Sequence, residues 1–385
     1  MDGIRIVVLV MSAAFWLISI NPSAAAASVV RDFEWEYAPK ALRAEPAPTT
    51  VNEDQYVTYP ITVGAYSSRL EFRITVTYGP TIDVYLVDAT NLELFKQGSQ
   101  FRYLIPGTDE STRDTIQTVP TAGLSGTYYI IVDNTDMGAT QPPYNGVNDA
   151  ATVAVTIRHW LGFGFQLTIP DEAHEAYRHV SIDERRTHWG FLVTTNDSYV
   201  REVANYLVRV STESSLQPYD LLSNMLAFSQ SLPYTPDSVT TGFDEYPRFP
   251  IETLAADGGD CEDTAILFAT LVQLAGHGAV LLAPPSHMAV GVAGTDLPGT
   301  FYEFEQRKYY FAETTGIGFE IGQLPSEYSG SQVQIFSITG AQYVPSYQGG
   351  GLDEVPANGL GVTALALAAL AFSQRAFFGR AKGNR

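Results

Sequence analysis

The sequence contains one cysteine, Cys261, in 385 residues, so no disulfide can form within the chain. The stability of the folded protein must come from hydrophobic cores, and the lone thiol is either an inert buried group or a reactive group with a chemical function. Basic residues are also scarce: 22 Lys and Arg face 42 Asp and Glu, giving a formal charge of −20. Because no basic stripe is present to neutralise phosphates, we expect no nucleic-acid partner.

Long apolar runs are absent from most of the chain and occur near its two ends. Arg5, the apolar segment 6–20 and the small residues of 23–28 form a pattern typical of an export signal, so residues 1–28 are predicted to be a signal peptide. Residues 359–378 form a second apolar segment, after a Gly- and Pro-containing linker at 346–358. Basic residues at its end predict a membrane anchor or sorting helix that leaves the rest of the protein outside the cell.

Residues 47–158 show short alternating apolar runs separated by turn residues, which predicts an all-β sandwich. The runs "IDVYLVD" and "GTYYIIVDNTD" resemble the small jelly-roll modules that accompany secreted peptidases. Four aspartates at or near the ends of these runs are candidates for a calcium site, although turn aspartates that accept backbone N–H bonds are the favoured interpretation. They are Asp83, Asp88, Asp133 and Asp136.

Cys261 stands at the start of a predicted buried helix. The preceding Gly258-Gly259-Asp260 indicates a tight turn and an N-cap, and residues 261–275 are helix formers with apolar residues on nearly every side. Unpaired N–H groups at a helix N-terminus favour a thiolate and can donate to an oxyanion. The neighbouring acidic residues disfavour the thiolate and raise the thiol pKa, so a reactive thiol needs a basic partner.

Other elements are predicted on both sides of this helix. Helices are expected over 197–211 and 218–231, before a Pro- and Asp-rich loop at 233–250 that is long enough to form a lip over a site. Strands are expected over 279–283, 287–292, 300–305 and 309–313, with turns at 284–285 and 306–308.

The runs "FSQSLPYTPD", "YPRFPIETLAADGGDCEDTAILFATLVQLAG", "HMAVGV" and "YYFAETT" occur in this order. Together they resemble the transglutaminase-like cysteine protease superfamily, a circularly rearranged relative of the papain fold. The resemblance covers residues 197–326 and implies a central helix packed on an antiparallel sheet.

The resemblance also implies a catalytic triad, in which Cys261 is the nucleophile, His287 the general base and acid, and Glu313 the residue that orients the imidazole. Glu303 and Glu305 are rival acids on the preceding strand, but "YYFAETT" matches the motif better. By analogy, Gln230 is a candidate oxyanion donor beside the Cys261 amide; a solvent-facing glutamine at the helix end is the alternative. Glu252 and Asp263 are expected to bond backbone amides of the lip and the helix.

The sequence therefore predicts a multidomain α+β protein, with a sandwich (47–158), a connecting region (159–196) and a papain- or transglutaminase-like catalytic domain (197–345). The expected activity is that of an exported, surface-tethered cysteine protease or amidase acting on proteins or peptides through a thioester. A transglutaminase that cross-links envelope proteins and an inactive surface-binding or adhesion protein are the alternatives. No cofactor or metal is expected, since His174 and His179 lack the i, i+4 spacing of zinc ligands.

Overall fold

The computed structural model describes residues 27–143, 145–243, 245–338 and 352–354. The predicted signal peptide (1–28) and linker (346–358) lie almost entirely outside these ranges, and the predicted C-terminal helix (359–378) lies wholly outside them. Of the helices within the described ranges, none combines the length and the apolar character needed to span a bilayer.

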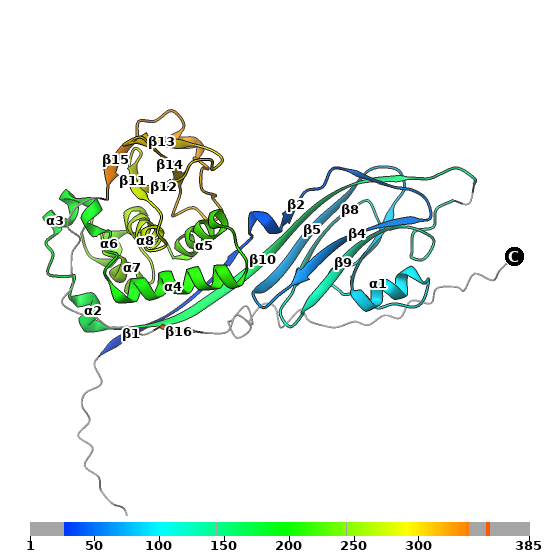
Figure 1. The fold of residues 1–385 in the computed structure, drawn as a ribbon, viewed down its shortest axis with the longest axis horizontal. Coiled ribbons are helices and arrows are strands. Elements are labelled where there is room, and N and C mark those ends of the chain that lie inside the picture. The colour runs from blue at the N-terminus through cyan, green and yellow to red at the C-terminus, as the bar shows by residue number, and fades with distance from the viewer. Residues whose placement is uncertain (1–26, 144, 244, 339–351, 355–385) are drawn as a thin grey trace, which may run out of the picture.

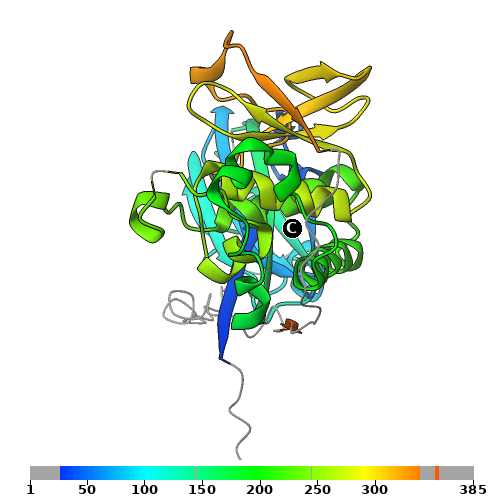
Figure 2. The ribbon, with the colours of Figure 1, turned by 90° about the vertical axis from the view of Figure 1, so that its left-hand side faces the viewer.

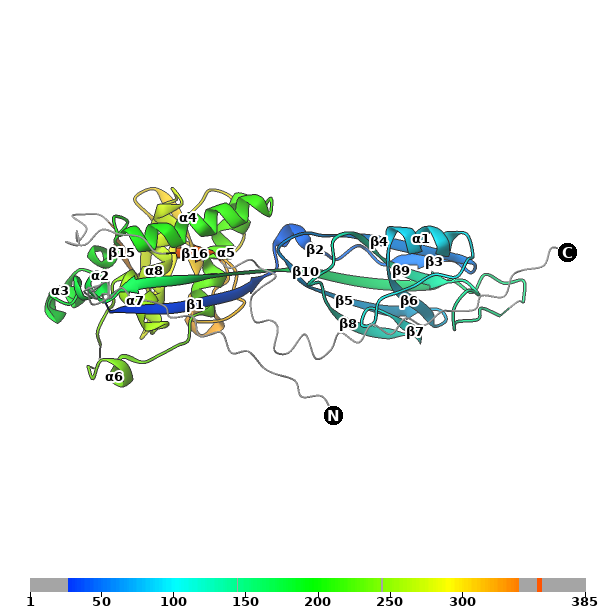
Figure 3. The same ribbon diagram turned by 90° about the horizontal axis from the view of Figure 1, so that it is seen from below.

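The described chain forms two lobes joined by one long strand, β10 (Ala151–Pro170), as Figures 1 and 3 show. The first half of β10 pairs with β5 (Ser67–Tyr78), and its second half pairs with β1 (Ser28–Tyr37). Odd-numbered residues of β10 are buried along its whole length. One alternating pattern therefore supplies the sandwich core as far as Ile157 and the core of the second lobe from Leu161 onward.

The first lobe is the predicted sandwich, built from two antiparallel sheets. In one sheet, β10 and β5 are joined by β2 (Arg43–Ala44), β3 (Thr49–Val51) and β8 (Asp114–Pro120). The other has the order β4 (Gln55–Val63), β9 (Gly126–Asn134), β6 (Ile82–Asp88), β7 (Asp109–Thr112). β-Branched and aromatic residues fill the space between the sheets. Helix α1 (Ala89–Lys96) packs Phe95 against the outer face of the second sheet.

Asp88 and Asp133 accept local hydrogen bonds, as the favoured interpretation predicts, whereas Asp83 lies inside β6 and bonds segments 28 and 57 residues away. The buried Asp83 carboxylate accepts from the backbone N–H groups of Ser111 (2.6 Å) and Thr140 (2.9 Å). Asp88 is the N-cap of α1, and Asp133 accepts from Thr135 N–H at 2.9 Å. These three carboxylates stabilise turns and a helix end.

The second lobe is organised around α8 (Cys261–Leu274), in which every residue from Glu262 to Val272 is buried. Helices pack around it and an antiparallel sheet covers it, as Figure 2 shows for the sheet above the helices. The helices are α4 (Ser198–Glu213), α5 (Pro218–Ser231) and α7 (Pro250–Ala256). The sheet order is β13 (Phe301–Phe304), β14 (Arg307–Ala312), β12 (Ala289–Ala293), β11 (Ala279–Ala283), β15 (Gln334–Ser337). Because Arg307 and Lys308 belong to β14, the turn expected at 306–308 lies one residue earlier, at Glu305–Gln306, where both φ angles are positive.

The N-terminal strand β1 belongs to the second lobe, although it precedes the sandwich in the chain. Trp35 packs against Phe228 of α5 with ring centroids 5.0 Å apart, and its indole N–H donates to Asn224 Oδ1 at 2.8 Å. A short strand, β16 (Leu352–Glu354), pairs with the same half of β10. From β1 in this lobe the described chain thus passes into the sandwich and returns along β10.

The expected connecting region, 159–196, contributes to the core of the second lobe rather than separating two domains. It contains α2 (Asp171–Glu175), α3 (Ile182–Thr187) and the short 3-10 helix Trp189–Leu192. Arg185 of α3 is fully buried and forms a two-pronged ion pair with Glu252 of α7, at 2.6 and 3.0 Å. This pair fixes the region to the helices around α8.

Candidate active site

Cys261 is the first residue of α8, as the sequence predicts, and the two preceding glycines allow the approach of other backbone segments. Gly258 has φ +145°, and a Cβ there would lie 2.5 Å from Pro233 O. Gly259 forms a parallel bridge with Tyr234 at the start of the lip loop. A side chain at either glycine would therefore displace the lip segment or the first turn of α8.

The carboxylates predicted to be structural bond the backbone of the lip and the helices. Glu252 Oε2 accepts from Phe249 N–H at 2.9 Å. Asp263 Oδ1 accepts from Arg248 N–H at 2.7 Å, and its Oδ2 accepts from Asp260 N–H at 3.3 Å. These bonds tie the end of the lip to the first turn of α8, which confirms the prediction for both residues.

His287 and Glu313 lie side by side because β12 and β14 are antiparallel neighbours, with Val290 opposite Ala312. His287 precedes β12 and Glu313 follows β14, so both side chains stand at the same edge of the sheet. The imidazole Nε2 lies 2.8 Å from Glu313 Oε2. The other carboxylate oxygen accepts from the Thr315 N–H (2.9 Å) and hydroxyl (2.6 Å). With Nε2–H donating to Glu313, Nδ1 is the ring nitrogen with a free lone pair.

Two contacts connect this pair to the first turn of α8. The backbone N–H of Met288, the residue after His287, hydrogen-bonds the sulfur of Cys261 and lowers its pKa. The hydroxyls of Thr264 and Thr314 lie 2.9 Å apart, which joins α8 to the residue after Glu313. The residue after His287 and the residue after Glu313 thus both contact the first turn of α8. The hydrogen bond of the thiol itself goes to Glu262 Oε2, 3.3 Å away.

The electrostatic surroundings keep the thiol protonated in the resting structure. Burial raises the pKa of Cys261 above its ordinary value, and the Glu262 carboxyl adds to the shift. Burial and the adjacent Asp260 raise the pKa of Glu262 to about 9. Burial alone would raise the pKa of Glu313, but the hydrogen bonds from His287 and Thr315 outweigh this effect and hold the pKa below its ordinary range.

Three carboxylates near the thiol are close enough to share a metal ion. Oxygens of Asp237, Asp260 and Glu262 lie within 4.8 Å of one another. Arg248 places positive charge on the same group, with Nη2 3.1 Å from Asp237 Oδ1 and a second ion pair to Asp263. Sequence spacing does not reveal this cluster, because the lip loop brings Asp237 to the first turn of α8.

Gln230 is neither the expected oxyanion donor nor a solvent-facing residue. It is buried at the end of α5, and its Nε2 donates to the backbone oxygens of Glu313 (2.8 Å) and Phe319 (3.0 Å). Its Oε1 accepts from Gly318 N–H at 3.1 Å. Both amide hydrogens are engaged, so none remains for an oxyanion. Gln230 instead holds the loop that follows Glu313 in place.

Tyr328 is a part of the site that sequence reasoning missed. Its ring stacks on the His287 imidazole, with centroids 5.2 Å apart and planes 8° from parallel. It lies in a 3-10 turn, Ser326–Tyr328, beyond the last matching motif. No local pattern distinguishes this tyrosine from the 21 others in the chain, because only the packing of the turn over the sheet edge places it there.

Comparison with known proteins gives weak matches. No family model matches the sequence, and no curated protein matches it either. Among solved structures, a "Putative Cysteine Protease from Cytophaga hutchinsonii" shares 11% identity, with a TM-score of 0.23 over 82% of this chain and 100% of that one. A "putative protease from Parabacteroides distasonis ATCC 8503" shares 11% identity, with a TM-score of 0.22 over 74% and 72%. Scores this low leave the function to be argued from the side chains of this protein.

Proposed function

We propose that the protein is a cysteine peptidase or amidase of the transglutaminase-like type, which hydrolyses peptide or isopeptide bonds through a thioester at Cys261. The observation that carries the proposal is that the chain's only thiol, at the start of a buried helix, accepts the N–H of Met288, the residue after an imidazole that Glu313 holds. His287 acts as base and acid, and Glu313 positions the ring. The export and membrane-anchor patterns at the two ends place this activity outside the cell in our proposal.

In the proposed first step, His287 Nδ1 takes the thiol proton as Sγ attacks the carbonyl carbon. The oxyanion that forms accepts a hydrogen bond from the Cys261 backbone N–H. This N–H has no acceptor within α8 because Cys261 is the first residue of the helix. The imidazolium then gives its proton to the leaving amine, and the thioester remains. Water attacks this thioester, losing a proton to His287, and the acid is released as the thiol is restored.

The raised pKa of Cys261 favours a mechanism that begins from the neutral thiol. The Glu262 carboxyl accepts the S–H in the resting state, so the thiol must turn from Glu262 to Nδ1 before it reacts. Glu313 stabilises the imidazolium that forms, because its lowered pKa keeps it ionised at neutral pH. The Tyr328 ring restricts the imidazole to the plane in which Nε2 faces Glu313.

The proposal is tested by hydrolysis of fluorescently labelled casein and of a peptide library by the purified protein. We expect Cys261→Ala to abolish cleavage and His287→Ala to reduce it by at least about 100-fold, the range for general acid–base catalysis. His277→Ala is the matched control: His277 lies beyond the C-terminal end of α8, and this variant should cleave within twofold of wild type. A Cys261→Ala protein that still hydrolyses the substrates would reject the proposal.

A further inference from the structure

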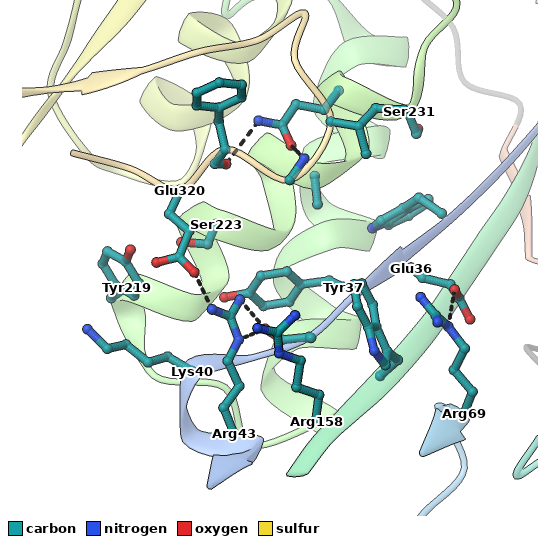
Figure 4. Close-up of a pocket in the computed structure, with 18 residues that line it drawn as sticks. Glu36, Tyr37, Lys40, Arg43, Arg69, Arg158, Tyr219, Ser223, Ser231 and Glu320 are labelled. Atoms are coloured by element: carbon teal, nitrogen blue, oxygen red, sulfur yellow. Dashed lines mark hydrogen bonds and ion pairs between the residues drawn. The ribbon is translucent and has the colours of Figure 1, made fainter. Parts of the chain in front are cut away.

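A cavity of about 590 Å³ lies between the two lobes. One wall is formed by the segment from β1 to β2 together with β5 and β10, and the other by α5 and the loop at 317–320, as Figure 4 shows. The volume is within the range of about 300–1,000 Å³ that is typical of ligand pockets. Its lining residues come from five separate stretches of chain, so only the joined lobes create it.

The side chains that line the cavity include more cations than carboxylates, although the protein has a net charge of −20 and Glu71, behind the lining, also pairs with Arg69. Four cationic side chains and two carboxylates line it, which leaves a surplus of two positive charges (4 − 2). Both carboxylates are already paired: Glu36 lies 2.8 Å from Arg69, and Glu320 forms an ion pair with Arg43. The surplus therefore resides on the other two cations, Lys40 and Arg158.

Lys40 and Arg158 are exposed, and among the described residues no carboxylate lies within ion-pair distance of either side chain. The Lys40 ammonium stands over the ring of Tyr219, 5.8 Å from its centroid. Arg158 projects from β10 on the same wall, where its Cα partner in the neighbouring strand is Arg43 (Figure 4). Two cations without an ion-pair partner among the described residues thus line one wall of the cavity.

Aromatic side chains supply the apolar part of the lining. The Arg69 guanidinium stacks on Trp160 at 4.0 Å, which provides a flat surface of ring and guanidinium. Trp35, Tyr219 and Phe319 also line the cavity. A ligand that fits must therefore carry negative charge together with apolar groups.

From this geometry we propose that the cavity binds a short acidic peptide, with its carboxylates at Lys40 and Arg158 and its apolar side chains against Trp160 and Phe319. A phosphorylated ligand fits less well, because the nearby N-terminal turn of α5 is occupied by Asp220. That carboxylate accepts from the Tyr37 hydroxyl (2.6 Å) and the Lys40 N–H (2.9 Å), so no backbone cradle for phosphate remains there.

The bound peptide contacts the loop that carries the proposed catalytic acid. Phe319 and Gly318 line the cavity, and both bond Gln230, whose Nε2 also donates to Glu313 O. The cavity thus lies on the reverse side of the Glu313 loop. This site stands apart from the thiol and does not depend on the proposed hydrolysis.

Tryptophan fluorescence tests the proposal, since Trp35 and Trp160 both line the cavity. The full chain is used with Cys261→Ala, so that the probe is not cleaved. The probe is acetyl-Glu-Glu-Phe with a free carboxylate, and acetyl-Gln-Gln-Phe-amide is its neutral counterpart. We expect saturable quenching by the acidic peptide, at least tenfold weaker binding of the neutral one, and weaker acidic-peptide binding at high salt.

Charge reversal locates the binding. Arg158→Glu and Lys40→Glu should each weaken acidic-peptide binding by about tenfold, whereas Arg102→Glu, at an exposed position outside the cavity, should change it less than twofold. Circular dichroism confirms that each variant is folded. The proposal is overturned if the two peptides bind equally well or if ADP binds more tightly than the acidic peptide. It is also overturned if the Arg158→Glu protein binds the peptide like its parent, or if the Arg102 and Arg158 variants lose equal affinity.

Discussion

Replacing Glu262 with glutamine tests what holds the Cys261 thiol in its protonated form. The buried Glu262 carboxyl lies 3.3 Å from the sulfur, which is partly buried. After burial, it is the largest cause of the raised thiol pKa. Glutamine keeps the shape of the protonated acid and removes only the ability to ionise, so the packing of the first turn of α8 should be retained.

The expected fall in the thiol pKa follows from the distance between the sulfur and the Glu262 carboxylate. Two unit charges about 4 Å apart interact by about 4 kcal/mol at an effective dielectric constant of about 20. Since one pKa unit corresponds to about 1.4 kcal/mol, removing the carboxylate charge lowers the thiol pKa by up to about 3 units. The pKa of Glu262 is itself about 9, so the carboxyl carries a proton below that pH and the two proteins should diverge above it.

Alkylation of Cys261 by iodoacetamide, followed by mass spectrometry from pH 6 to 10.5, measures this directly because the protein has no other thiol. We expect wild type to react slowly up to the ordinary thiol pKa of about 8.5. At pH 9.5, Glu262→Gln should react at least tenfold faster than wild type. Glu303→Gln, the same change at an exposed position on β13, should follow wild type. Superimposable profiles for wild type and Glu262→Gln across the whole range would refute the reasoning.

Two further predictions concern stability. Arg185→Met leaves the Glu252 carboxylate buried without its partner, so it should lower the free energy of unfolding in urea by about 3–5 kcal/mol. The control, Arg178→Met, breaks an exposed pair with Glu175 and should lower it by under about 1 kcal/mol. Equal losses in the two variants would contradict the role of burial. Because the pKa of Glu313 is lowered on folding, its ionised form stabilises the protein above the unfolded value of 4.5, and this contribution is lost as pH falls through the lowered value. The stability difference between wild type and Glu313→Gln should therefore shrink between pH 6 and 3, and a constant difference would argue against the His287 contact as its source.

Local sequence signals predicted the elements that carry the candidate triad. The glycines and Asp260 before Cys261 marked the start of α8, and period-2 patterns marked the strands next to His287 and Glu313. Such signals are reliable because capping and alternation depend on residues a few positions apart. The role of Gln230 could not be inferred in this way, since its bonds reach residues more than 80 positions along the chain.

The alternation along β10 shows the limit of such signals. The sandwich was predicted to end at residue 158, but the alternating burial continues to Pro170, and such a pattern is compatible with one core or with two. Register with β5 and β1 decides that the strand crosses from one lobe to the other. For this reason the region at 159–196 was expected to connect two domains, although its residues complete the second core.

The sequence by itself therefore determined the exclusion of disulfides, the sandwich, the buried helix and the position of its lone thiol, because composition and short-range periodicity are sufficient for these. The tertiary structure alone decided that β1 packs on α5, that Tyr328 stacks on His287 and that four cationic side chains line the cavity between the lobes. These features join residues that are remote in the chain. Their proximity results from strand pairing and packing between the lobes, which no local pattern of residues specifies.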